Sequence, residues 1–189
     1  MVIDEAAIQK AVESIILAIG ENPKREGIAD TPKRVAEMYV ELFAGMGVDP
    51  KDELTGGFEE GHREMVIIRD IPFYSTCEHH FLPFYGVTHI GYIPNSNGRV
   101  VGASKLARVV EIVARRPQLQ ERMTTQIAEA IVEGLQPEGV GVVIQAEHLC
   151  MIMRGIKKPG SAIVTSAVRG TFRSKSKTRA EFFSLLQNK

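Results

Sequence analysis

Apolar residues at helical spacing open the chain and predict two helices. From residue 5 to residue 20, isoleucine and valine recur every three or four positions and so share one helix face, and Gly20 is expected to end this helix. Thr31 followed by Pro32 is typical of a helix start, with Thr31 as the cap. Apolar residues then repeat with a helical period as far as Phe43, which predicts the second helix.

Beyond a loop rich in glycine and acidic residues, at about 48–63, the pattern changes to strands. Short β-branched or alternating runs predict strands at 65–71, 87–93, 140–146 and 161–168. Helical periods predict a helix capped by Ser104 and broken at Arg116–Pro117, and further helices at 119–135 and 179–186. The apolar residues 151–153 are interpreted as a continuation of the third strand past His148.

The order of these elements predicts an α+β fold. Two helices precede the sequence strand, strand, helix, helix, strand, strand (β-β-α-α-β-β), and a last helix closes the chain. Strands that follow one another in this way favour a mostly antiparallel sheet with helices on it. We expect residues 1–60 to form an N-terminal helical segment and residues 61–189 to form the domain that holds the functional residues.

Composition narrows the function. The chain has 189 residues, of which 44% are hydrophobic and 24% charged, and its formal net charge is zero. Zero net charge argues against a nucleic-acid partner, but it leaves open a local basic pocket for a small anion. No apolar run is long enough to span a membrane, and residues 1–5 do not resemble a secretory signal. We therefore expect no membrane partner and a cytoplasmic protein with reduced thiols.

Both cysteines lie beside histidines. Cys77 is followed by His79 and His80, and His148 precedes Cys150 by two residues. The spacing of Cys77 and His80 allows one turn to present a thiolate and an imidazole to the same ion. On a strand, His148 and Cys150 would project from one face. Thiolate combined with imidazole favours zinc.

The sequence leaves three arrangements of this group open. A disulfide between Cys77 and Cys150 is rare in a reducing compartment. A closed structural zinc site would use four protein ligands, whereas three ligands leave a position for water, which catalysis needs. A chain of this size needs no metal to hold a core, and His79 adds a titratable group that a structural site does not need; both favour the open site. His62 and His89 are interpreted as surface or packing residues.

A second candidate site lies in the segment 102–108. Lys105 and Arg108 are three residues apart at an expected helix start, where free backbone N–H groups also attract anions. A solvated helix start would explain the same spacing. Arg154, four residues after Cys150, is expected to place a guanidinium beside the metal, and Arg34 lies in the first turn of the second helix.

These segments closely resemble the GTP cyclohydrolase I family. The matching segments are 75–80, 102–108, 116–122 and 147–150, together with 30–36 and 165–166, in the family's order over nearly the whole chain. The resemblance implies an enzyme that converts GTP and water into formate and 7,8-dihydroneopterin triphosphate, the entry step of folate or other pterin biosynthesis. It also implies a tunnelling fold for the predicted sheet and its two helices.

The resemblance further implies roles for single residues. Cys77, His80 and Cys150 would bind one Zn²⁺ per subunit, with water as the fourth ligand, and His79 and His148 would transfer protons. The remaining residues would bind the substrate: Arg34, Lys105, Arg108 and Arg154 at the triphosphate, Ser104 near the ribose, and Gln120 and Glu121 at the guanine.

The family resemblance also implies a toroidal homodecamer whose active sites lie between subunits, so that Arg34 could act in a neighbour's site. Two other functions compete with this one. Another pterin or deazapurine enzyme of the tunnelling fold would lack the pairing of Cys77 and His80 with Cys150. A zinc-stabilised binding module would keep the metal but release no formate from GTP.

Overall fold

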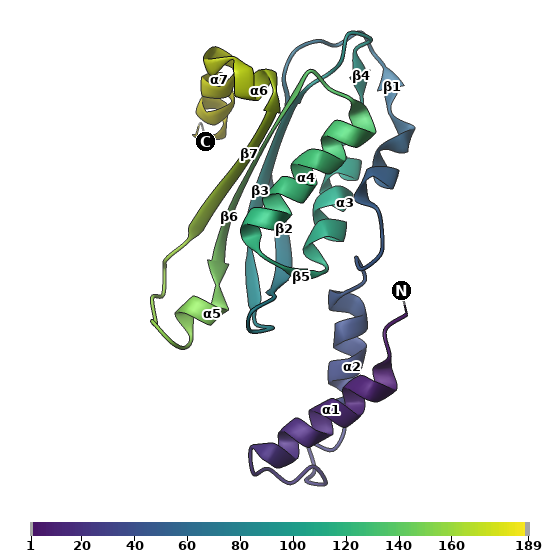
Figure 1. The fold of residues 1–189 in the computed structure, drawn as a ribbon, viewed down its shortest axis with the longest axis vertical. Coiled ribbons are helices and arrows are strands. Elements are labelled where there is room, and N and C mark those ends of the chain that lie inside the picture. Colours follow the sequence, from purple (N-terminus) through teal and green to yellow (C-terminus); the bar gives the residue numbers. More distant parts are fainter. Residues whose placement is uncertain (1, 188–189) are drawn as a thin grey trace.

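The structure, a computed structural model, describes residues 2–187 (Figure 1). Its elements are, in chain order, α1 (Glu5–Ala18), α2 (Thr31–Leu42), the 3-10 helix η1 (Pro50–Gly56), β1 (Phe58–Glu59), β2 (Val66–Cys77), β3 (Pro83–Ile93), β4 (Arg99–Val100), α3 (Ala103–Ala114), β5 (Pro117–Gln118), α4 (Gln120–Leu135), β6 (Gly139–His148), α5 (Leu149–Ile152), β7 (Ile163–Gly170), α6 (Thr171–Ser174) and α7 (Ser176–Gln187). No helix within the described range is both long and apolar enough to cross a bilayer.

A five-stranded sheet in the order β5-β2-β3-β6-β7 is the centre of the fold. Every neighbouring pair is antiparallel except β2 with β5, which is parallel. The strands β1 and β4 form a separate antiparallel pair. The expected α+β class and the order β-β-α-α-β-β are therefore confirmed in β2, β3, α3, α4, β6 and β7, with the helical pair α1 and α2 ahead of them.

Helices α3 and α4 pack on one face of this sheet and enclose the main core (Figure 1). Alternation along β2 produces that face, because Ile71, Phe73 and Ser75 are buried while Tyr74 between them is exposed. The largest side chains buried in this core are those of Leu54, Phe84, Ile90, Tyr92, Leu106, Met123, Ile127, Ile131, Leu135 and Ile144.

A smaller core forms where α6 and α7 pack on the sheet. Phe172 and Phe182 are fully buried there, with their rings 5.3 Å apart in an edge-to-face arrangement. Two strand glycines make room for them. A Cβ atom at Gly91 would lie 2.7 Å from the ring of Phe182, and one at Gly141 would lie 2.8 Å from both rings. The closing helix is thus fitted to the sheet by the absence of two side chains.

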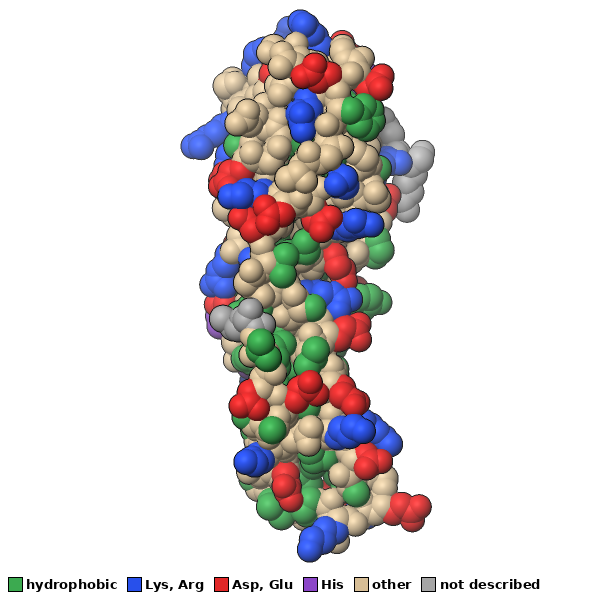
Figure 2. All heavy atoms as spheres, turned by 90° about the vertical axis from the view of Figure 1, so that its right-hand side faces the viewer, with side chains coloured by type: hydrophobic (Ala, Val, Ile, Leu, Met, Phe, Trp, Pro, Cys, Tyr) green, Lys and Arg blue, Asp and Glu red, His purple; other side chains and the backbone are tan. Residues whose placement is uncertain are grey.

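The helical pair α1 and α2 extends beyond one end of the sheet and makes the molecule elongated (Figures 1 and 2). The segment just after α2 holds this helical pair to the rest of the molecule. There the Gly45 N–H donates to the carbonyl of Arg115 at 3.0 Å, and Arg116 Nε donates to the carbonyl of Gly45 at 2.9 Å. A Cβ atom at Gly45 would lie 2.0 Å from the carbonyl oxygen of Ile112, so this approach needs glycine. Leu54 in η1 already belongs to the main core, while the division at residue 60 stays a prediction.

Several local predictions were wrong. Residues 149–152 form the helix α5, so β6 ends at His148 and no strand continues to residue 153. Ser104 lies inside α3 and forms no capping hydrogen bond, because the helix begins one residue earlier, after Gly102. Likewise Thr31 is the first residue of α2 and Asp30 occupies the cap position.

Strand β2 continues to Cys77, beyond the predicted 65–71, and contains a bulge within the predicted segment. Pairing with β3 shifts between Ile68 and Ile71, and Asp70 adopts a left-handed conformation with φ of 58°. The Asp70 backbone N–H donates to Nδ1 of His89 at 3.1 Å. Since Nδ1 accepts this bond, the imidazole of His89 is neutral in the folded protein.

Burial lowers the pKa of His89, an effect that Asp70 opposes and Arg69 reinforces. The unfolded chain therefore takes up a proton at a higher pH than the folded protein does. The contribution of His89 to stability is complete above its ordinary pKa of about 6.5 and is lost as pH falls toward the lower pKa of the folded state.

We predict that His89→Asn weakens the pH dependence of the unfolding temperature between about pH 7.5 and pH 5. The Asn side chain keeps an acceptor for the Asp70 N–H but does not titrate. Calorimetry of both proteins across this range is the measurement. His62→Asn, in an exposed loop, is the control and should keep the full dependence. Equal pH dependence in all three proteins would contradict the prediction.

Candidate active site

The register of three strands brings the two cysteine segments together. Ser75 on β2 pairs with Phe84 on β3, and Phe84 pairs with His148 on β6, so these three residues form one row across the sheet. Both outer strands run in the same direction, antiparallel to β3. Cys77 and Cys150 therefore each lie two residues beyond this row, at the same end of the sheet.

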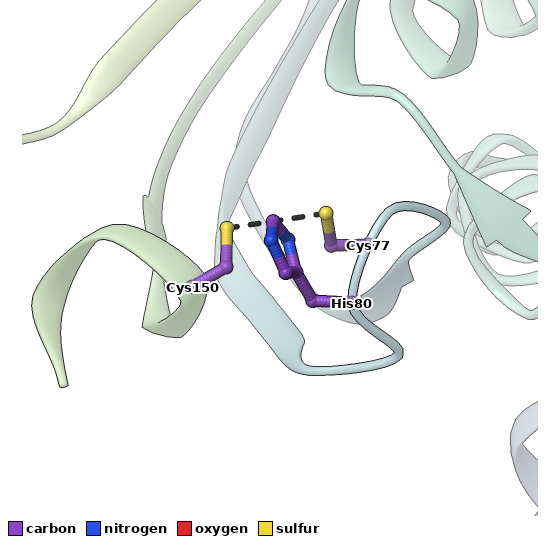
Figure 3. Close-up of side chains that lie close together, drawn as sticks. All are labelled: Cys77, His80 and Cys150. Carbon is purple, nitrogen blue, oxygen red and sulfur yellow. Dashed lines mark hydrogen bonds between the residues drawn. The ribbon is translucent and has the colours of Figure 1, made fainter. Parts of the chain in front are cut away.

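Cys77, His80 and Cys150 form a compact group at that end (Figure 3). Their ligand atoms all lie within 4.8 Å of one another, and the two sulfur atoms are 3.9 Å apart. Two thiolates bound to one tetrahedral zinc ion, with Zn–S bonds of about 2.3 Å, would lie about 3.8 Å apart. The donor set and its spacing therefore fit zinc.

The helix α5 makes this convergence possible. Strands β2 and β6 are separated by β3, so their backbones lie about 9–10 Å apart. The helical turn from Leu149 to Ile152 carries Cys150 toward Cys77, as Figure 3 shows. A strand continuing past His148 would have kept the strand spacing and pointed alternate side chains away from the group.

The geometry decides between the arrangements that the sequence leaves open. Both cysteines are free, and 3.9 Å between sulfur atoms is almost twice the length of an S–S bond, about 2.05 Å. His148 does not complete a four-ligand site, because its Nε2 is 2.8 Å from the side-chain oxygen of Gln120. Among the described residues the group has three candidate protein ligands, which would leave one position of a tetrahedral ion open.

This group borders a pocket of about 380 Å³. Besides the three candidate ligands, the pocket is lined by His79, Gln118, Leu119, Gln120, Glu121, His148, Met151, Arg154, Gly155, Ile156 and Ile163. It thus places two imidazoles, a carboxylate and a guanidinium beside the metal group. The residues that line the pocket come from the end of β2 and the turn after it, from β5 and the start of α4, from the end of β6, from α5 and the segment after it, and from the start of β7.

His148 is held rigidly on one wall of this pocket. The ring is 8% exposed and stacks on Phe84, with centroids 4.5 Å apart and planes only 6° from parallel. Burial lowers the pKa of His148, and Glu121 nearby partly opposes this. The imidazole is therefore neutral at neutral pH and has one N–H group.

Gln120 determines which nitrogen of His148 has the proton. Its Nε2 donates to the carbonyls of Ile144 and Ile163 and to the hydroxyl of Thr165, at 3.1, 3.0 and 3.1 Å. With the amide nitrogen fixed in this way, the oxygen faces His148 and can only accept, so Nε2 of His148 is the donor and Nδ1 keeps its lone pair. Gln120 is 1% exposed, so its side chain acts from behind His148.

Arg154 adds a permanent positive charge beside the metal group. Its Nη1 lies 3.1 Å from Nε2 of His80. Burial and the adjacent Cys77 raise the pKa of the Cys150 thiol, while Arg154 lowers it. A bound cation would favour the thiolate form of both cysteines.

Four of the predicted substrate-binding residues do not line this pocket. Arg34 is exposed on α2 and pairs with Asp30 at 3.5 Å. Lys105 Nζ donates to the carbonyl of Glu53 at 2.8 Å, and Arg108 lies 3.5 Å from the Glu53 carboxylate. Ser104 lies beside them in the first turn of α3. The structure therefore brings together the residues predicted for metal binding, proton transfer and guanine recognition with Arg154, but not these four.

Sequence reasoning missed the residues that support His148. Phe84 stacks on its ring, and Thr124 bonds both the backbone carbonyl of Gln120, at 2.7 Å, and the hydroxyl of Thr165, at 2.6 Å. The segment 165–166 stands out in the sequence only as a match to the family. A single sequence gives no signal for this contact, because Thr124 and Thr165 lie on a helix and a strand that meet only in the fold.

Comparison with known proteins agrees with this geometry. The chain matches the GTP cyclohydrolase I family over residues 8–187. The chain belongs to this family. A GTP cyclohydrolase 1 from Dehalococcoides mccartyi is 67% identical over 186 residues, which is 98% of each chain. Those from Halalkalibacterium halodurans and Thermobifida fusca are 60% and 59% identical, covering 98% and 97% of this chain and 98% and 89% of their own.

Among solved structures, the apo form of an archaeosine synthase QueF-Like matches 56% of this chain and 93% of its own, with 18% identity and a TM-score of 0.46. The enzyme class expected from the sequence is that of the family: a GTP cyclohydrolase, a hydrolase that acts on GTP. Within the described residues, the cysteine and histidine group could hold a metal ion.

Two adjacent histidines allow a matched test of the metal group in this GTP cyclohydrolase. We predict that His80→Ala lowers zinc affinity more than about tenfold, because it removes a ligand, whereas His79→Ala leaves zinc affinity nearly unchanged. Competition with a chromophoric chelator measures both. The assignment is wrong if the two variants bind zinc equally well, or if His79→Ala is the one that loses it.

A second prediction concerns the bond between Gln120 and His148. In the zinc-loaded protein, ¹⁵N NMR should show His148 protonated at Nε2. Gln120→Leu should abolish this preference and lower the free energy of unfolding by about 1–3 kcal/mol, since it leaves buried polar groups without partners. Gln145→Leu, on the exposed face of β6, should do neither. A proton found on Nδ1 of His148 would contradict the prediction.

Proposed function

We propose that this pocket is where the chain converts GTP and water into formate and 7,8-dihydroneopterin triphosphate, with Cys77, His80 and Cys150 holding one Zn²⁺ per subunit. The observation that carries this is a pair of thiols and an imidazole at zinc spacing, beside a pocket with a carboxylate, a buried imidazole and a guanidinium. A zinc ion bound there would supply an acidified water molecule at neutral pH.

Proton transfer falls to the two histidines of the pocket that are not metal ligands. His148 presents Nδ1 as the free ring nitrogen, since Nε2 is bonded to Gln120. It can accept a proton there and return it to a ring nitrogen of the purine as that ring opens. His79, exposed next to the ligand His80, is the second proton-transfer residue.

Guanine recognition falls to Glu121 in the first turn of α4. Guanine presents a ring N–H beside an amino group, and an ionised carboxylate accepts both bonds at once. Gln120 precedes Glu121 and is fixed by its own hydrogen bonds, so it holds the start of α4 and His148 in place around the base. Its contribution to guanine recognition therefore comes through position.

The triphosphate is bound by Arg154 in the pocket and by residues from outside it. We assign Lys105, Arg108 and Arg34 to the triphosphate and Ser104 to the neighbourhood of the ribose. Because these four do not line the pocket of their own chain, they act in the site of an adjacent subunit of a toroidal homodecamer. The enzyme works in the cytoplasm, where its cysteines stay reduced.

Incubation of the zinc-loaded protein with GTP tests this function. It should release formate and yield a pterin that fluoresces after oxidation, and a chelator should stop both. A binding module with the same zinc site would release neither product. If the fluorescent product still formed after the metal had been removed and its absence verified, the metal assignment would be wrong.

We predict that Glu121→Ala and Glu121→Gln both lose nearly all turnover of GTP while keeping zinc. The Gln side chain has one acceptor oxygen and places a donor against a donor of guanine, so it cannot replace the carboxylate. Formate release and zinc content are measured together. Glu133→Gln, exposed on the same helix, is the control and should turn over normally. Near-normal activity of Glu121→Ala would show that Glu121 is an ordinary solvated residue of the helix and does not bind guanine.

A further inference from the structure

The proposed site consists of two halves that belong to different parts of the chain. The loop from Cys77 to His80 provides two metal ligands, while the start of α4 provides Gln120 and Glu121. The reaction requires the metal ion and the guanine base to keep a fixed position relative to each other. The contacts that join the two halves therefore decide whether a bound substrate is aligned.

Backbone pairing makes the first of these contacts. Cys77 pairs with Gln118 in the parallel ladder of β2 and β5, and the Glu78 N–H donates to the carbonyl of Gln118 at 3.0 Å. The strand β5 is only two residues long, so this ladder ends here. Beyond it, a side-chain contact joins the loop to α4.

Glu78 and Arg122 make that contact. Glu78 lies between the ligand Cys77 and His79, and Arg122 directly follows Glu121. Arg122 Nη1 donates to Glu78 Oε2 at 2.5 Å and Nη2 donates to Oε1 at 3.0 Å, so the guanidinium and the carboxylate form a two-point fork. Neither residue lines the pocket.

We propose that the Glu78–Arg122 pair is a positioning device that holds the metal-binding loop against the base-binding end of α4. It rests on the site proposed above and adds two residues that touch neither metal nor substrate. Two parallel bonds fix the angle between loop and helix, which a single bond would leave free.

Energetics separate this role from a general stabilising one. Both side chains are partly exposed, 44% for Arg122 and 29% for Glu78, so solvent screens the pair and its contribution to folding stability is modest. A displacement of about 1 Å between reacting groups, in contrast, can lower a rate about a hundredfold. Loss of the pair should therefore be visible in turnover and hardly visible in unfolding.

Arg122 could instead be one more cation for the triphosphate. Its fork, however, is occupied by Glu78, whereas Arg154 is the guanidinium that lines the pocket. The two roles differ in kinetics. A triphosphate contact would weaken GTP binding, while a positioning residue lowers kcat and leaves binding largely intact.

The chain contains a matched control pair. Arg25 Nε and Nη2 donate to the two carboxylate oxygens of Glu21 at 3.2 and 3.1 Å, which is also a two-point fork between partly exposed side chains, although Arg122 uses its two Nη atoms. This pair follows α1, and neither residue lines the metal pocket. Removing the guanidinium of Arg25 breaks a two-point ion pair, as removing that of Arg122 does, but this pair has no contact with the proposed site.

The test compares Arg122→Met and Glu78→Gln with Arg25→Met, each saturated with zinc and GTP. The two site variants should lose about ten- to a hundredfold in kcat. Their dissociation constants for GTP should stay within a factor of two, and their unfolding temperatures should equal that of Arg25→Met within a few degrees. Arg122→Lys should recover only part of the rate, because an ammonium cannot form the fork. Arg25→Met should keep full kcat.

Binding is measured by calorimetry before turnover starts, so it does not depend on activity. The exchanged double variant, Glu78→Arg with Arg122→Glu, restores an opposite-charge pair and should recover part of the rate that either single variant loses. Unchanged kcat in Arg122→Met, a loss in GTP affinity as large as the loss in kcat, or no recovery in the exchanged pair would each overturn the positioning role. An unmodified protein that released no formate would instead overturn the proposed function.

Discussion

The pairing register of β2, β3 and β6 is the constraint on which the site depends. It places Ser75, Phe84 and His148 in one row, and the candidate metal group forms just beyond that row, from the end of β2, the turn after it and helix α5. In this way the sulfur atoms of two cysteines that are 73 residues apart in sequence come within 3.9 Å of each other. A shift of the register by one residue would turn His148 to the opposite face of the sheet and separate it from Gln120.

Around the residues set by this register, different side chains serve for binding and for orientation. The candidate metal ligands lie at the pocket wall, whereas buried polar groups behind them fix orientation. Gln120 is the clearest example, since its amide contacts two carbonyls and a hydroxyl while its oxygen sets the tautomer of His148. Such a network is costly to leave unpaired inside a protein, so it holds one arrangement. The pair of Glu78 and Arg122 extends this alignment to the surface.

Much of this could be predicted from the sequence, because strand and helix periods are local signals. The two helices, the order of the strands and the grouping of both cysteines with histidines were all readable. The predictions that failed concern features set by tertiary contacts. Residues 151–153 were expected to continue a strand because their apolar side chains fit either form, whereas Leu149–Ile152 is a helix. Strand β2 continues to Cys77, beyond the predicted end at residue 71. The support of His148 by Phe84 and Thr165 joins residues that only the fold brings together.

Zinc-edge X-ray absorption of the loaded protein tests the central claim most directly. The claim is that two segments far apart in sequence bind one ion through two thiolates and one imidazole and leave one position for water. The spectrum should show two sulfur atoms at about 2.3 Å and two lighter atoms at about 2.0–2.1 Å, and Cys150→Ser should leave one sulfur. The claim would be contradicted if the zinc ion in the unmodified protein had only one sulfur ligand. It would also be contradicted if Cys150→Ser left the number of sulfur ligands unchanged.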